Sequence, residues 1–174
     1  QSGGGTIRLT AADNVLIDGP GDIDITGGQT GIGVLEINAG GDLSIAGTVD
    51  GTTGGSGGQI SANVTGAAEV SGDMIFDGSL SLDACSISLT GSALVKNKEG
   101  QSSNRLVARE QITIAAGAQL QATGSGSFNE LVYRDAALPP LINGNVSPAA
   151  QVTVDATLLA CPGCGDGIVQ SSEQ

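Results

Sequence analysis

Histidine is absent from the 174-residue sequence, and basic residues are scarce. Lys and Arg together number 6, against 18 Asp and Glu, so the formal net charge is −12. A protein that binds a nucleic-acid backbone or an anionic membrane surface needs a basic patch, and this chain has too few cations to form one. The composition therefore argues against nucleic acid and against an anionic membrane as partners.

Aromatic residues are almost missing as well, at 2% of the chain, although 39% of the residues are hydrophobic. A disordered chain would have few aliphatic residues, so we expect a packed core. A sandwich or barrel usually fills its wide interior with aromatic side chains. A core of small aliphatic residues is instead typical of the narrow interior of stacked coils. A β-sandwich remains the structural alternative, because regularly spaced short strands suit it too.

Long apolar runs and helical periodicity are also lacking. No run reaches the roughly 18 apolar residues that span a bilayer, so no membrane insertion is predicted. Gly numbers 29 and interrupts every stretch that could form an amphipathic helix. The sequence begins at Gln1 rather than at a methionine, and we expect a mature start from which an export signal has been removed.

What the chain does contain is a repeat of alternating segments. Residues 6–27 hold three of them, TIRLTA, DNVLIDG and GDIDITG, and apolar residues recur every eight positions within them. Read as strands, these segments place one set of side chains on a single inward face. The members of this set are Ile7, Leu9, Val15, Ile17, Ile23 and Ile25. The three segments therefore indicate one three-sided coil.

Similar units follow along the chain. Their starts, at Thr6, Val34, Gln59, Leu80, Arg105 and Glu130, lie 28, 25, 21, 25 and 25 residues apart. In the third unit, the sequence leaves open whether Ile75 or the pair Met74 and Phe76 faces inward. In the fourth unit, the inward candidates are Leu80, Leu82, Ile87, Leu89 and Leu94. A repeat of about two dozen residues is typical of a solenoid.

The prediction for the fold is an all-β, right-handed parallel β-helix (β-solenoid) of about six three-sided coils. We expect it to occupy residues 1–160, with a C-terminal tail over residues 161–174.

The three cysteines leave several interpretations open. Cys85 stands alone at the end of a strand-like segment and is interpreted as a small buried hydrophobic residue. Cys161 and Cys164 form a C-P-G-C motif. Haem attachment would need His where Gly165 stands, zinc would need two further ligands, and a redox motif would need a βαβ context. A local disulfide, or partners elsewhere, are the remaining possibilities.

Two segments resemble known bacterial families. The run CGDGIVQSSEQ, which starts at Cys164, resembles the opening of a cysteine-rich repeat in large secreted proteins of myxobacteria and their relatives. This resemblance implies a piece of a longer exported protein, in which Cys164 lacks its usual partner and pairs with Cys161. The segment GGDLSIAGTVDG, residues 40–51, is similar to the Gly-rich repeats of filamentous-haemagglutinin-like surface adhesins. That resemblance implies a parallel β-helix at the bacterial cell surface or outside the cell.

Aspartates are frequent where the coils are expected to turn. The set comprises Asp13, Asp18, Asp22, Asp24, Asp42, Asp50, Asp73, Asp77 and Asp83. Turn chemistry is the preferred interpretation, and calcium binding the alternative, because calcium takes several oxygen ligands at Gly-rich turns. Residues 19–28, GPGDIDITGG, are partly similar to a calcium-binding nonapeptide but do not repeat in tandem. We therefore predict no metal site.

Catalysis would need clustered carboxylates with basic and aromatic residues nearby. The six basic residues are scattered. Arg105, Arg109 and Glu110 could line one coil face, but they fit solvated outward positions equally well. The sequence thus predicts a non-catalytic extracellular structural or adhesive protein with no cofactor. We expect it to associate with itself through its coil ends, as in a head-to-tail fibre, or with neighbouring domains, and glycans are possible ligands. The alternative is a carbohydrate-active, lyase- or hydrolase-like, or calcium-dependent glycan-binding β-helix.

Overall fold

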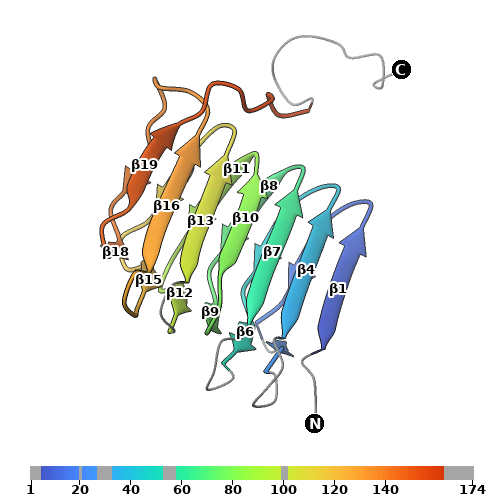
Figure 1. Ribbon diagram of the computed structural model, residues 1–174. Coiled ribbons are helices and arrows are strands. Elements are labelled where there is room, and N and C mark those ends of the chain that lie inside the picture. Colours follow the sequence, from blue (N-terminus) through green and yellow to red (C-terminus); the bar gives the residue numbers. More distant parts are fainter. Residues whose placement is uncertain (1–4, 20, 27–32, 53–57, 99–101, 163–174) are drawn as a thin grey trace.

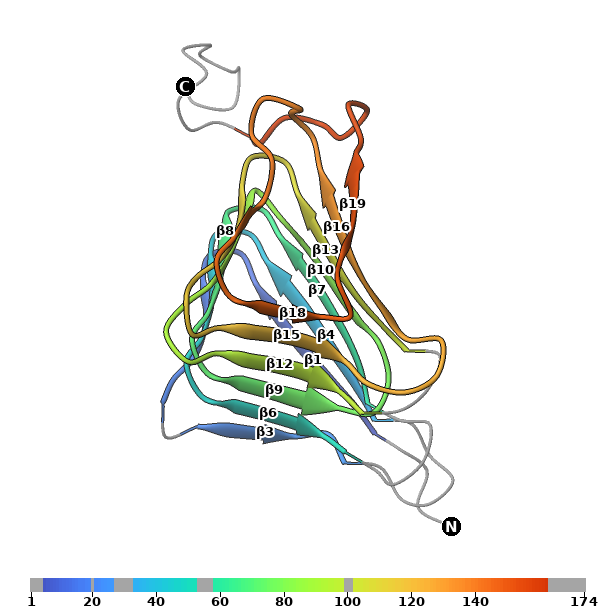
Figure 2. The same cartoon turned by 90° about the vertical axis from the view of Figure 1, so that its left-hand side faces the viewer.

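The computed structural model describes residues 5–19, 21–26, 33–52, 58–98 and 102–162. These residues form nineteen strands and no helix, and every strand pairs in parallel with its neighbours in one of three sheets. The chain visits the three sheets in turn, so each coil has three sides (Figure 2). The predicted fold class, an all-β parallel β-solenoid, is therefore confirmed. The described residues include no helix that could cross a membrane.

The first sheet, called the β1 sheet here, faces the reader in Figure 1 and has seven strands. In spatial order they are β1 (Thr6–Ala11), β4 (Val34–Ala39), β7 (Gln59–Val64), β10 (Leu80–Ala84), β13 (Ser103–Ala108), β16 (Phe128–Tyr133) and β19 (Gln151–Val154).

The β2 sheet and the β3 sheet have six strands each. The β2 sheet consists of β2 (Val15–Ile17), β5 (Leu43–Ile45), β8 (Ala67–Val70), β11 (Ser86–Leu89), β14 (Ile112–Ile114) and β17 (Leu141–Ile142). The β3 sheet consists of β3 (Asp22–Asp24), β6 (Thr48–Gly51), β9 (Asp73–Phe76), β12 (Leu94–Asn97), β15 (Gln119–Ala122) and β18 (Asn145–Ser147).

Aliphatic ladders fill the interior. Successive residues of a strand point to opposite faces, and parallel strands of adjacent coils lie about 4.8 Å apart, so each inward side chain stacks on its equivalent in the next coil. One ladder runs through all six strands of the β2 sheet: Ile17, Ile45, Val70, Leu89, Ile114 and Ile142. The inward set predicted for the first coil packs against this core.

Two coils show why alternation alone does not determine which residues face inward. In the third coil, Met74 and Phe76 are buried and Ile75 is half-buried on the outside, which resolves the open choice. In the fourth coil, the prediction for Leu94 is wrong: Ala93 and Val95 are buried, and Leu94 is half-buried on the outside. Because Ala93, Leu94 and Val95 are all apolar, the sequence fits either alternation of inward and outward side chains. The pairing of Val95 with Met74, which is buried, determines the alternation that is observed.

The fifth coil starts earlier than predicted. Leu80 pairs with Asn104, and Arg105 pairs with Ser81 on the outer face. The unit was predicted to begin at Arg105, whereas β13 begins at Ser103 and includes Asn104, which is buried in the core. About five turns of the solenoid enclose a buried interior, slightly fewer than the six predicted. The strands after β16 leave most of their side chains exposed.

The corners of adjacent coils stack so closely that position 72 is predicted to accept only glycine. A Cβ atom added to Gly72 would lie 2.1 Å from the carbonyl oxygen of Gly47, so the Gly72→Ala variant has to displace backbone. We expect its free energy of unfolding to fall by about 1–3 kcal/mol. Gly19→Ala is the matched control, since its Cβ would meet no atom within 4 Å. Urea unfolding followed by circular dichroism measures both, and equal midpoints would contradict the stacking.

Candidate functional site

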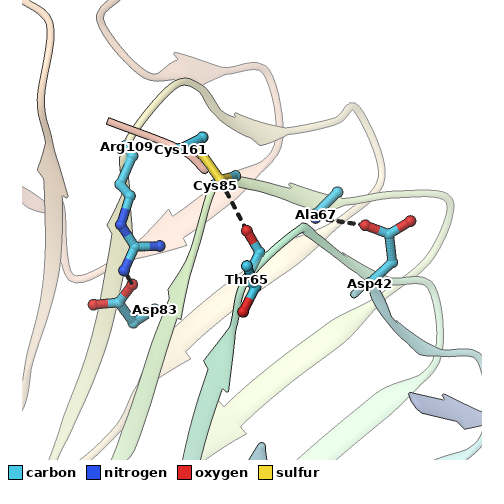
Figure 3. Close-up of a disulfide and its surroundings, with 7 residues drawn as sticks. All are labelled: Asp42, Thr65, Ala67, Asp83, Cys85, Arg109 and Cys161. Carbon is cyan, nitrogen blue, oxygen red and sulfur yellow. Dashed lines mark hydrogen bonds and ion pairs between the residues drawn. A yellow bond between two sulfur atoms is a disulfide. The ribbon is translucent and has the colours of Figure 1, made fainter. Parts of the chain in front are cut away.

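A disulfide joins distant parts of the solenoid. Cys85 directly follows β10, Cys161 lies beyond β19, and the two are 76 residues apart in sequence with their Cα atoms 5.5 Å apart (Figure 3). The interpretation of Cys85 as a free buried residue is therefore wrong. Cys161 has its partner elsewhere, and it is not available to Cys164, the partner that the C-terminal resemblance implied. Cys164 itself lies outside the described residues.

The coils below and above hold Cys85 in place. Its backbone N–H donates to the carbonyl oxygen of Gly66 at 2.8 Å, and its own carbonyl accepts from the N–H of Glu110 at 2.8 Å. Its Sγ atom lies 3.0 Å from the carbonyl oxygen of Thr65 (Figure 3). This is a contact rather than a hydrogen bond, because a disulfide sulfur carries no proton. The disulfide is thus anchored at the end of β10, where backbone hydrogen bonds join Cys85 to the coils on both sides.

Residues 155–162, called the strap here, lead from β19 back to Cys85. The strap begins at a turn in which the carboxylate of Asp155 accepts hydrogen bonds from the Oγ1 of Thr157 at 2.6 Å and from its N–H at 3.0 Å. The side-chain and then the backbone hydrogen bond from Thr157 lower the pKa of Asp155. From there the strap passes the ends of β16 and β13 (Figure 1).

A groove of about 760 Å³ lies between the strap and the outer face of the β1 sheet. Its floor carries hydroxyl and amide side chains from β1, β4 and β7, among them Thr10, Asn38 and Asn63. The Nδ2 of Asn63 donates to the Oδ1 of Asn38 at 3.4 Å. The strap contributes Leu158 and Leu159. One wall of the groove is therefore apolar, and its floor offers hydrogen-bond donors and acceptors at successive coils.

The charged groups on this face are paired. Arg109 and Asp83 line the groove and form an ion pair at 2.6 Å, with a quarter to a third of each side chain exposed. Arg105 forms a second ion pair with Glu130 at 2.8 Å. Arg105 thus lies on β13 and Arg109 in the bend directly after it, each with its own carboxylate, while Glu110 is exposed in the same bend.

Most of the aspartates that make side-chain hydrogen bonds stabilise turns, as the preferred interpretation predicted. The carboxylate of Asp24 accepts from the N–H of Thr26 at 2.7 Å, and the side-chain and backbone hydrogen bonds of Thr26 lower the pKa of Asp24. Asp42 accepts from the N–H of Ala67 in the next coil at 2.8 Å (Figure 3). No group of three or more Cys, Asp or Glu side chains in the described part of the chain has the arrangement of a metal site.

A ladder of buried asparagines was not predicted. Asn97, Asn104 and Asn129 are fully buried inside the solenoid. The Nδ2 of Asn104 donates to the Oδ1 of Asn129 and to the carbonyl oxygen of Gln121, both at 2.9 Å, and its Oδ1 accepts from Asn97 at 3.2 Å. Aligning SNRLVA with FNELVY, which places the two asparagines at one position, could have revealed part of this ladder.

Comparisons of the sequence and the structure with protein-family models, curated proteins and solved structures found no significant match.

Proposed function

We propose that this chain is a non-catalytic β-solenoid of the bacterial cell exterior, with a structural or adhesive role, and that its strapped groove binds a glycan. The observation that carries the proposal is the Cys85–Cys161 disulfide, which holds the strap over the sheet. Disulfides persist in oxidising surroundings such as the extracellular space. The resemblance of residues 40–51 to surface-adhesin repeats supports the same location.

The lining of the groove supports binding of a polyhydroxylated ligand. Thr10, Asn38 and Asn63 present side-chain donors and acceptors from three adjacent strands, so an extended chain laid across the coils meets a new polar group at each one. Leu159 is 81% exposed at the strap and offers apolar surface to the less polar face of a sugar ring. Binding sites commonly combine apolar walls with a few placed polar groups.

The state of the charged groups favours binding over catalysis. General acid–base chemistry needs a carboxylate that exchanges protons with the substrate. In the groove, Asp83 is bound to Arg109 at 2.6 Å. The alternative, a lyase- or hydrolase-like activity, would use this same pair, since both side chains line the groove.

A glycan array with the purified chain tests the proposal. We expect bound glycans that are not cleaved, and a loss of affinity of about tenfold or more in the Asn38→Ala, Asn63→Ala double variant, because each lost hydrogen bond contributes about 1 kcal/mol. Ser44→Ala with Ser88→Ala, on outer positions of the β2 sheet, is the matched control and should bind normally.

Three outcomes would count against this function. Equal binding by the groove variant and the control would place the ligand elsewhere. Shortened oligosaccharides in the incubated sample would favour the enzymatic alternative. Loss of binding in EDTA with recovery in calcium would favour the calcium-dependent form.

A further inference from the structure

The last coil presents inward-facing apolar side chains that no further coil covers in the described part of the chain. Val152 stacks on Leu131 and Ile142 on Ile114, as the core ladders do elsewhere. Leu131 and Ile114 are fully buried, whereas Val152 is 49% and Ile142 is 42% exposed. The exposed residues occupy core positions, so a covering coil would bury them.

Each sheet also ends in strands with one unpaired edge. β1 and β19 are the outermost strands of the β1 sheet, β2 and β17 of the β2 sheet, and β3 and β18 of the β3 sheet. Natural edge strands usually carry charges, prolines or bulges that prevent pairing with another chain. β19 reads QVTV and has neither a charge nor a proline, and β1 has a single charge at Arg8.

We propose that a second copy of this chain covers the last coil, with its β1 on β19, its β2 on β17 and its β3 on β18. Continuing the observed registers places Leu9 of the second copy on Val152, Ile17 on Ile142, and Ile23 on Val146. All six are aliphatic and occupy inward positions, so the core ladders run on across the junction. This inference rests on the structural role proposed above.

Charge favours the head-to-tail arrangement over a contact between two N-terminal ends. β3 carries Asp22 and Asp24, both exposed, at the edge where the next copy pairs. In the proposed register they lie opposite Asn145 and Ser147, which are uncharged and can hydrogen-bond to a carboxylate. If two N-terminal ends met instead, the acidic strands would face each other, and like charges on paired strands are destabilising.

Light scattering of the full chain over a range of concentrations tests the association. We expect the average mass to rise with concentration, and Val152→Lys to remain monomeric because it places a charge in the junction. Thr153→Lys on the same strand is the matched control, because Thr153 pairs with Val132 and points to the outer face of the sheet, away from the core. This variant should associate like the unchanged chain. Circular dichroism confirms that both variants fold.

Cross-linking tests the register. Thr10 of one copy is predicted to lie opposite Thr153 of the next, at the roughly 4.8 Å spacing of paired strands, so mixed Thr10→Cys and Thr153→Cys chains, each also carrying Cys164→Ser, should form a disulfide-linked heterodimer. Thr10→Cys with Gln151→Cys is the control. Its two positions are offset by two residues, which places them beyond the roughly 7 Å that a disulfide can bridge.

A dimer formed by Thr153→Cys alone would mean that C-terminal ends meet, and it would overturn the inference. Monomers at every concentration would overturn it too. Neither result affects glycan binding by the groove, so a failure here is distinguishable from a failure of the proposed function.

Discussion

Replacing both Cys85 and Cys161 with serine should lower the free energy of unfolding by about 4 kcal/mol. The bond closes a loop of 76 residues, and in the chain-entropy treatment such a long loop restricts the unfolded chain strongly. Denaturation by urea in a Cys164→Ser background measures the difference without a competing thiol. A reducing agent should reproduce the loss in the parent and leave the double variant unchanged.

Hydrogen exchange should show where the loss arises. Without the disulfide, the strap loses its covalent link to Cys85, so its amides should exchange faster in the variant than in the parent, whereas those of β10, which pairs on both sides, should change less. Equal stability of the parent and the serine variant would mean that the strap is held by its noncovalent contacts instead.

A second large effect is expected from Asn104→Leu. Leucine fits the aliphatic ladder formed by Leu80 and its neighbours, yet it leaves the amide of Asn97, the carbonyl of Gln121 and the side-chain oxygen of Asn129 without their hydrogen bonds to residue 104. A buried polar group left unpaired costs about 1–3 kcal/mol. We therefore expect a loss of about 3 kcal/mol or more from a substitution that makes the core more apolar.

The measurement compares the unfolding midpoint of Asn104→Leu with that of Asn63→Leu. Asn63 is exposed on the outer face of the same sheet, so its replacement should change stability by less than about 0.5 kcal/mol. If the two variants unfold at the same midpoint, the asparagine ladder contributes no more than a surface amide does.

The parallel coils could be predicted because alternation and a repeat of about two dozen residues both depend on local sequence. Which residues of a strand face inward could not be predicted where consecutive residues are all apolar, as at Leu94, because the register with the coil below determines it. Asn104 was missed because its burial is favourable only with partners from other coils. The groove was missed for a similar reason: no local pattern links Cys161 to Cys85.

The position of the disulfide also determines how the molecule carries a mechanical load. Tension applied between the N-terminal coils and the chain beyond Cys161 passes through the two sulfur atoms directly to β10. The intervening residues 86–160, which include β11 to β19, lie outside this path and bear no force while the bond is intact. Under such a load the solenoid would extend in the coils that precede Cys85, and these include β1, β4 and β7, the strands that form the floor of the groove.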